Sequence, residues 1–357
     1  MLGLYIHIPF CKKKCFYCDF LSINYDDVLT DEYISTIIKE SQQYKYNSIS
    51  TIYIGGGTPS VLSLKQLEKL IKHIKLIFDI SNLQEFTVEL NPESTTIEKL
   101  KLLYDENITR LSFGLQSIND NILQHLGRLH NFNKFQEVYN NAIRIGFDNI
   151  NIDLMYGIQN QTLNDWEKTI DTVLKFNSNH ISLYPLTIEQ GTKFYQQNIK
   201  VDTDLQRQMY EIACNMFKIN KFKHYEISNW AKEDKYSKHN KMYWQNKEYI
   251  GLGASSASYY KRYRFKNTLS ISEYIKNITH GKNSIIEKEY IDDTIYNIET
   301  IMLGLRLSDG VDEKYFYNKK NILDKYINEG MLNIKNNKVS LTEEALFISN
   351  SIISDLI

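Results

Sequence analysis

The chain has 357 residues, of which 42% are hydrophobic and 24% are charged, and its formal net charge is −1. This length predicts about two domains and a substantial buried core. The near-neutral charge excludes a global attraction to nucleic acid or to an anionic membrane surface. Residues 1–10 are too short and too uncharged to predict a signal or transit peptide, and no apolar run reaches the ~18 residues of a membrane helix. We therefore expect a cytoplasmic protein, in which disulfides are rare.

Short strand-like segments recur along the first half of the chain, with helical patterns between them. They cover residues 4–8, 51–54, 86–90, 110–115, 150–155 and 180–185. Residues 63–78 carry apolar side chains near positions i, i+3, i+4 and i+7, which is typical of an amphipathic helix. Strands that alternate with helices predict parallel βα units. We expect an α/β fold built on an incomplete (β/α)₆ barrel, and a doubly wound open sheet is the alternative.

The strand rhythm fades after about residue 205. Residues 206–290 are rich in aromatic residues, Gly, His and Asn, and we expect them to form a loop-rich cap over the barrel mouth. The pattern in residues 291–357 predicts two helices, a small hairpin with an Asn-Asn turn and a closing helix, which resembles a winged-helix topology. We therefore expect three parts, at 1–205, 206–290 and 291–357.

Three of the four cysteines lie within eight positions, as Cys11-x₃-Cys15-x₂-Cys18. Structural zinc usually takes four ligands in paired C-x₂-C units, and Cys214 is almost two hundred residues away. Its surroundings, "YEIACNMF", predict an apolar helix face and an inert buried thiol. Three thiols on one loop suit an iron–sulfur cluster that leaves one iron open. Three reduced structural cysteines are the other interpretation.

The segment "CKKKCFYC" (11–18) resembles the signature of the radical S-adenosylmethionine (radical SAM) superfamily. The resemblance implies a [4Fe-4S] cluster held by Cys11, Cys15 and Cys18. It further implies that the fourth iron binds the amino and carboxylate groups of SAM, whose reductive cleavage gives a 5′-deoxyadenosyl radical. In a barrel, such chemistry lies at the C-terminal ends of the strands.

A glycine triplet, Gly55, Gly56 and Gly57, directly follows the second predicted strand. Alone, such a triplet indicates a tight turn or a close backbone approach to a ligand. With the cysteine loop upstream, the resemblance implies that these glycines receive the amino group of SAM.

Further residues at or near strand ends match the SAM-binding positions of the oxygen-independent coproporphyrinogen oxidase branch of the superfamily. Taken alone, each polar residue of this set could be exposed to solvent or paired with another side chain for structural reasons. The resemblance implies that four of them contact the ribose, the adenine or the methionine carboxylate of SAM: Glu89, Gln116, Arg128 and Asp153. It places Tyr5 and Tyr17 beside the cluster and SAM. Tyr5 could equally be a core residue of its strand.

The segments "YIHIPFC", "IGGGTPS", "RLSFGLQS", "IDLMYG" and "HNKMYW" resemble the HemW branch of haem chaperones, and the resemblance covers nearly the whole chain. In "HNKMYW" (239–244), His239 could ligate haem iron while Tyr243 and Trp244 offer flat faces to a porphyrin. A hydrogen-bonded loop residue is the alternative for His239. The segment after Gly253 reads "ASSASY", whereas members of the branch often carry a histidine there.

Three functions follow from these patterns. The first is a radical SAM haem chaperone that carries haem as cargo to a client protein, possibly membrane-associated, and takes electrons from a donor. The second is an oxidase that decarboxylates coproporphyrinogen III. Against the second, Cys18 is followed by Asp19 and Phe20 where oxidases of this family carry a further cysteine in C-x-C, and only four residues precede Tyr5. We therefore do not expect oxidase activity.

The third function is a winged-helix regulator with an iron–sulfur sensor. Residues 311–357 contain six Lys, no Arg and seven acidic residues. This segment lacks the basic footprint of a DNA-binding domain, so we expect no nucleic-acid partner.

Overall fold

Six parallel strands form the centre of the molecule in this computed structural model, which describes residues 1–232 and 235–357. They are hydrogen-bonded neighbours in chain order: β1 (Gly3–Ile8), β4 (Thr51–Gly56), β5 (Glu85–Leu90), β6 (Arg110–Gln116), β7 (Ile150–Tyr156) and β8 (His180–Pro185). Each lies within two residues of a predicted strand. In the described residues no ladder joins β8 to β1, so the predicted incomplete barrel is confirmed.

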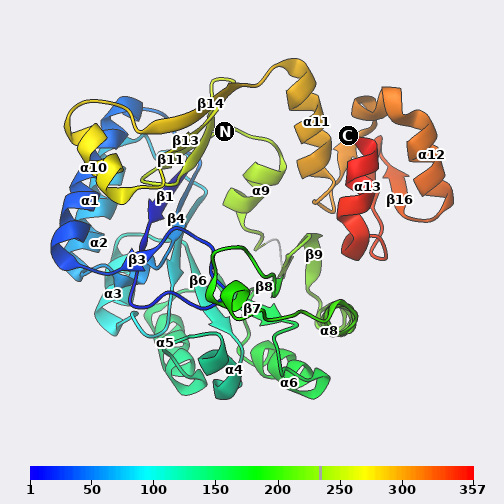
Figure 1. Ribbon diagram of the computed structural model, residues 1–357, viewed down its shortest axis with the longest axis horizontal. Helices are drawn as coiled ribbons and strands as arrows, with labels where there is room; N and C mark the ends of the chain where they lie inside the picture. The colour runs from blue at the N-terminus through cyan, green and yellow to red at the C-terminus, as the bar shows by residue number, and fades with distance from the viewer. Residues whose placement is uncertain (233–234) are drawn as a thin grey trace.

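Helices connect these strands and cover the outside of the curved sheet (Figure 1). They are α1 (Asp27–Ser41), α2 (Leu64–Ile77), α3 (Ile97–Asp105), α4 (Asp120–His125), α5 (Phe132–Ile145) and α6 (Leu163–Leu174), with short 3₁₀ turns at Gln42–Tyr44 and Pro59–Val61. The amphipathic helix predicted at 63–78 is α2, which Ser63 and Gln66 start with a reciprocal capping box.

The alternation of side chains along the strands separates two environments. In β7, for example, Ile150, Ile152 and Leu154 belong to the large core cluster, whereas Asn151 and Asp153 lie between them in sequence. Because successive side chains of a strand point to opposite faces, the apolar set packs against the helices and the polar set faces the barrel interior. The interior is therefore polar and available for ligand chemistry.

The structure corrects the expectation that residues 206–290 form a loop-rich cap, because this segment extends the sheet at both edges. On one side β11 (Tyr249–Leu252) pairs parallel with β1, followed by β12 (Ala257–Tyr260), β13 (Tyr263–Asn267) and β14 (Ile285–Tyr290). On the other side β10 (Asn229–Ala231) pairs antiparallel with β8, followed by β9 (Lys223–Glu226). These strands have three to six residues, too few to show a clear sequence period. Helix α7 (Lys193–Gln196) precedes this region and α8 (Thr203–Ile219) leads into it, while α9 (Lys238–Trp244) and α10 (Ile271–Thr279) lie within it.

The C-terminal unit has its own small core, centred on residues such as Ile301, Phe316 and Leu356. It contains helices α11 (Asp293–Gly304), α12 (Lys320–Asn328) and α13 (Ser349–Leu356), 3₁₀ turns at Glu313–Lys319 and Leu346–Ile348, and a sheet of β15 (Val311–Asp312), β17 (Lys338–Leu341) and β16 (Leu332–Lys335). The predicted hairpin is β16–β17, and Asn336 and Asn337 both have positive φ, as its tight turn requires.

The domain boundaries remain proposals. The separate core of the C-terminal unit supports a division near residue 291. Around residue 205, in contrast, core residues from both sides, such as Leu4 and Met209, belong to one hydrophobic cluster. None of the helices in the described ranges is long and apolar enough to cross a membrane.

Candidate functional site

The cysteine loop lies between β2 (Phe10–Cys11) and β3 (Ile23–Asn24), two short strands that pair with each other. Two of its lysines fix its shape. Lys14 Nζ donates to the carbonyl of Phe20 at 2.9 Å, and Lys12 Nζ reaches the carbonyl of Glu93 at 2.8 Å. The loop is thereby tied both to itself and to the segment that follows β5.

The three predicted cluster ligands line one cavity of about 490 Å³ at the C-terminal ends of the strands. Cys11 Sγ lies 3.3 Å from Thr58 Oγ1, and Arg128 donates to Cys15 Sγ at 3.7 Å. Burial raises the pKa of Cys11, and it raises that of Cys18 to about 11. The thiolate is the metal ligand, so loading the site must displace protons from these thiols.

All three cysteines are free, and all three line the same cavity. Among residues 1–232 and 235–357, no three His, Cys, Asp or Glu side chains are grouped closely enough to hold a metal ion. Three sulfur donors around a cavity fit a multi-iron cluster, whose ligands are cysteine sulfurs.

Gly56 forms the floor of the cavity beside the cysteine loop. Its φ is +108°, and a Cβ at this position would lie 2.6 Å from the His7 ring, so both backbone and space require glycine. Its N–H donates to Glu89 Oε2 at 3.1 Å. Gly57 also lines the cavity, whereas Gly55 lies beneath it, where its missing Cβ leaves room for the Glu89 carboxylate.

Two carboxylates face the cavity from neighbouring parts of the sheet. Glu89 also accepts from the Tyr53 hydroxyl at 2.7 Å, and Asp153 accepts from Asn151 Nδ2 at 2.7 Å. Burial raises the pKa of Glu89 to about 7, with a contribution from the charge of Asp153, and burial also raises the pKa of Asp153. Ammonium or hydroxyl donors of a ligand would stabilise the charged form of these buried carboxylates.

Gln116 combines two unusual features at the end of β6. It has φ +70°, which is uncommon for a residue with a side chain, and the β6–β7 register shifts just before it. Its Oε1 is buried without a hydrogen-bond partner among the described residues. Strained backbone and an unpaired buried acceptor are typical of ligand sites.

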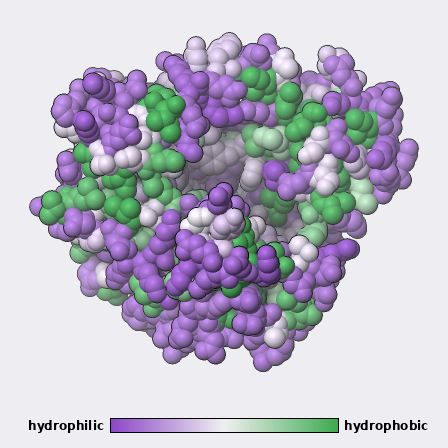
Figure 2. Space-filling view, viewed as in Figure 1, coloured by the Kyte–Doolittle hydropathy of each residue, from purple (hydrophilic) through white to green (hydrophobic). Residues whose placement is uncertain are grey.

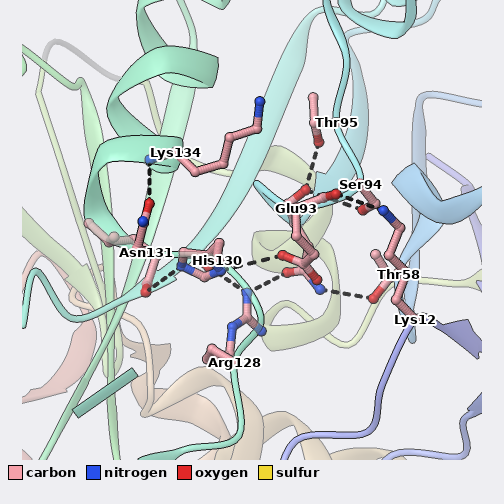
Figure 3. Close-up of polar contacts among 12 residues, drawn as sticks. Lys12, Thr58, Glu93, Ser94, Thr95, Arg128, His130, Asn131 and Lys134 are labelled. Carbon is pink, nitrogen blue, oxygen red and sulfur yellow. Dashed lines mark hydrogen bonds and ion pairs between the residues drawn. The ribbon is translucent and has the colours of Figure 1, made fainter. Parts of the chain in front are cut away.

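Arg128 connects the cavity wall to the polar cluster in Figure 3. Its Nη2 donates to Asn91 Oδ1 at 2.7 Å and to the Gly114 carbonyl at 2.6 Å. Burial alone would lower the pKa of Arg128, but Tyr17, Cys15 and Glu93 together raise it, so the guanidinium stays charged. Glu93 in turn lies 3.3 Å from His130 Nδ1, and both side chains point toward one another above Arg128 (Figure 3).

Thr58, Asn91 and Gly114 belong to the site but were missed in the sequence. A Cβ at Gly114 would lie 2.9 Å from Asn91 Oδ1 and 3.1 Å from Arg128 Nη2, so glycine is what allows these two side chains to meet. Thr58 follows the glycine triplet and Asn91 follows Glu89 by two positions, and both line the cavity. Their place just after strand ends was the available signal.

The two predicted tyrosines lie at different depths. Tyr17 lines the cavity, and burial raises its pKa. Tyr5 does not line it, because its hydroxyl is hydrogen-bonded to His7 Nδ1 at 2.9 Å and its ring lies inside the barrel near Tyr53. Tyr5 therefore supports the His7 ring against which Gly56 packs.

His239 lies at the opposite end of the barrel, on α9. Its Nδ1 is hydrogen-bonded to Thr51 Oγ1 and its Nε2 to the Tyr243 hydroxyl, both at 2.8 Å. Thr51 begins β4, so this is the N-terminal base of the barrel. The side chain is buried, its ring stacks on Tyr53 at 5.3 Å, and burial lowers its pKa to about 3. Neither ring nitrogen is free for iron in this conformation, which matches the alternative of a hydrogen-bonded residue.

Cys214 lies on α8 and does not line the cavity of the cysteine loop, and that it is no cluster ligand stays a prediction. It is, however, partly exposed and lines a different cavity, so the expectation of a buried thiol is corrected. The thiol lies at the edge of the core, where α8 meets the C-terminal unit.

Comparisons with known proteins agree with this geometry. A family profile described as "Radical SAM superfamily" matches residues 5–173. The chain is 35% identical to the haem chaperone HemW of Bacillus subtilis (strain 168), over 99% of this chain and 98% of that protein. It is 33% identical to the haem chaperone HemW of Lactococcus lactis subsp. lactis (strain IL1403), over 98% and 95% of the two chains.

Among solved structures, the fold is similar to that of coproporphyrinogen III oxidase (HemN) from Escherichia coli, described as a radical SAM enzyme. The TM-score is 0.87 over 99% of this chain and 89% of that chain, at 19% identity. This likeness shows the fold. The family profile and the two haem-chaperone relatives show that the chain belongs to the radical SAM superfamily and, within it, to the HemW family.

Proposed function

We propose that Cys11, Cys15 and Cys18 hold a [4Fe-4S] cluster and that SAM binds beside it. The supporting observation is that ten of the thirteen residues expected at the site line the same cavity, among them all three cysteines and Gly56. When bound, the cluster would supply an electron to SAM. The chain's own residues supply shape and charge, because the cysteine loop, the Gly56 floor and Arg128 enclose the space.

The carboxylates and the free acceptor of the cavity determine which ligand groups it favours. Glu89 and Asp153 would accept hydrogen bonds from hydroxyl or ammonium groups of SAM, and the unpaired Oε1 of Gln116 offers a further acceptor. The charged Arg128 suits a carboxylate. This pattern of acceptors around the buried Arg128 cation fits a zwitterionic nucleoside ligand.

We propose that the protein as a whole acts as a haem chaperone, which binds haem and passes it to a client protein in the cytoplasm. The support is the near full-length similarity to two haem chaperones. An electron donor for the cluster and a haem-accepting client, possibly membrane-associated, are the partners that this function requires. No nucleic-acid partner is proposed, because the C-terminal unit carries six Lys, no Arg and seven acidic residues from 311 to 357.

The oxidase alternative has the fold likeness in its favour. Against it, Phe20 lines the cavity at the position where the C-x-C pattern of the oxidases would place a further thiol. We therefore propose that the protein does not decarboxylate coproporphyrinogen III.

Anaerobic purification followed by iron and sulfide assay, a haem titration and transfer of bound haem to an apo-haem protein tests this function. We expect four irons per chain, stoichiometric haem binding and transfer faster than spontaneous haem release. Formation of protoporphyrinogen IX from coproporphyrinogen III with SAM and a reductant would establish the oxidase instead. A chain that binds no haem would contradict the chaperone function.

A further inference from the structure

A second cavity, of about 910 Å³, lies between the barrel edge and the C-terminal unit. We call it the α8 cleft, and it is lined by α8, β9 and β10 on one side and by segments around Met331, Leu341 and Leu346–Ile348 on the other. Among the described residues, none lines both this cleft and the cavity of the cysteine loop. A ligand in the α8 cleft would therefore not compete for space with one beside the cluster. Figure 1 shows α8 and β9 on the side of the barrel that faces α13, and Figure 2 shows that this face of the molecule is hollowed near its centre.

Aromatic side chains form much of the barrel wall of the α8 cleft. The His224 and Trp230 rings stack face to face, 4.0 Å apart with an angle of 7° between them. Tyr210 packs against Trp230 at 6.1 Å, and across the cleft Phe347 lies 5.7 Å from Tyr210. Phe347 is 41% exposed and lines the cleft, so its ring is accessible to a ligand there. A cavity of this volume with aromatic walls suits a flat apolar ligand.

Two side chains one helical turn apart on α8 present polar atoms to this space. Tyr210 is 92% buried, and the polar group that its hydroxyl meets is the Cys214 thiol. Cys214, four residues later, places its thiol on the same helix face. The hydroxyl and the thiol therefore form one polar pair in a largely aromatic wall, and a ligand that binds the thiol would also meet the hydroxyl.

The opening of the α8 cleft carries charges of both signs. Arg207 and Lys218 each pair with a glutamate at 2.9 Å, in pairs that are mostly exposed and therefore weak. Lys223, also in the lining, forms no ion pair among the described residues. Arg306 lines the cleft with its guanidinium 5.6 Å from the Trp244 ring. Cations at the rim of an aromatic slot suit a flat ligand with carboxylate arms.

We propose that the α8 cleft is where the haem cargo binds, with Cys214 as the iron ligand and the Tyr210 hydroxyl beside it. Cysteine thiolate and tyrosine are both known types of haem ligand. On binding, an iron–sulfur bond forms and the thiol releases its proton to solvent, with no change in oxidation state. The proposal rests on the proposed haem-chaperone function and assigns the cargo to a site away from the cluster.

If haem binds in the α8 cleft, the "HNKMYW" segment contributes to haem binding by supporting a wall of the cleft. His239 and Tyr243 fix α9 at the base of the barrel, and Trp244 at the end of α9 lies against Arg306. The segment would therefore position one cation of the cleft without touching iron. Trp244 is a positioning residue in this account.

The test is a titration of the full-length, cluster-loaded chain with ferric haem, followed by its absorption spectrum. Cys214→Ser should shift the Soret band and weaken affinity at least about tenfold, and Phe347→Ala should weaken affinity about tenfold with an unchanged band position. Tyr317→Ala is the matched control, since Tyr317 is an aromatic residue of the same unit that is 79% exposed and outside the cleft. Iron content and SAM affinity should stay at wild-type values in all three variants, which shows that they fold.

Each result separates the alternatives. Unchanged haem affinity in both Cys214→Ser and Phe347→Ala would overturn the proposal that haem binds in the α8 cleft. It would leave the proposed chaperone function intact. Weaker binding in Phe347→Ala with an unchanged spectrum in Cys214→Ser would overturn Cys214 as the iron ligand. Absence of haem binding in the wild-type chain would overturn the proposed function itself.

Discussion

The two ends of the barrel use similar residue types for different purposes. At the base, Glu85 accepts hydrogen bonds from the backbone N–H groups of Lys238 and His239 and from the Thr87 hydroxyl, and both nitrogens of His239 have protein partners. At the mouth, the Gln116 amide oxygen has no partner among the described residues, and the carboxylates of Glu89 and Asp153 face a cavity. These polar side chains at the base are satisfied by the protein, whereas the Gln116 acceptor at the mouth is not.

This difference indicates how to distinguish a structural polar residue from a binding residue. A buried polar group whose hydrogen bonds are all made by the protein is stabilised little by a ligand. An unpaired buried group is stabilised most, because the ligand supplies its missing hydrogen bond. His239 belongs to the first kind and Gln116 to the second, although both were expected at the site from sequence.

The largest effect should come from the cysteine loop at the mouth. Replacing Cys11, Cys15 or Cys18 by alanine removes a sulfur donor, and we expect loss of essentially all iron and sulfide. Cys214→Ala is the control and should retain the cluster, because Cys214 lies in the α8 cleft. Anaerobic iron and sulfide assays measure this, and a full cluster in any of the three mouth variants would refute the ligand assignment.

Next in size is Gly56→Val, which should abolish SAM binding to the cluster-loaded chain. At φ +108° a side chain is strained, and its Cβ would meet the His7 ring at 2.6 Å. Glu89→Ala and Asp153→Ala should each weaken SAM binding by about 1.5–3 kcal/mol, because each variant loses charge-assisted hydrogen bonds to SAM. Anaerobic calorimetry gives the affinities. If all three variants bind SAM as the wild type does, SAM does not bind at the mouth.

At the base, His239→Ala should act on stability. It leaves Thr51 and Tyr243 without their partner and opens a cavity beneath Tyr53, so we expect a loss of about 2–4 kcal/mol in the free energy of unfolding. Urea denaturation measures this loss. SAM affinity under native conditions should be unchanged. A stable His239→Ala chain that has lost only haem would restore His239 as the haem ligand.

The smallest effect concerns pH. Burial raises the pKa of Glu89 from its ordinary value of 4.5 to about 7, so the folded chain holds this proton more tightly than the unfolded chain. The resulting stabilisation is complete below about pH 4.5 and is lost as the pH rises through about 7, by at most about 3 kcal/mol.

Glu89→Gln removes this titration. The difference in unfolding free energy between SAM-free wild type and variant should therefore change between pH 4.5 and 7 in favour of the variant. Glu40, whose pKa burial also raises to about 7, titrates in both chains and cancels in this difference. A difference that is constant with pH would mean that Glu89 ionises normally.

The sequence by itself determined the local and the chemically distinctive features. Strand–helix alternation was sufficient for the six parallel strands, because each element carries its own period. Three cysteines within eight positions on one loop must lie close together in any fold, so their common role could be inferred without a structure. The place of Gly56 after a strand indicated a tight turn or a close approach to a ligand, and only the resemblance to the radical SAM superfamily implied the ligand.

Only the tertiary structure decided where residues distant in sequence meet. The short strands β9 to β14 take their positions from pairing with the sheet edges, and nothing local specifies those edges. The partners of His239 come from residues up to 188 positions away, so its burial could not be inferred from its own segment. The α8 cleft likewise exists only because the C-terminal unit packs beside α8, where long-range contacts bring Cys214, Tyr210 and Phe347 around one space.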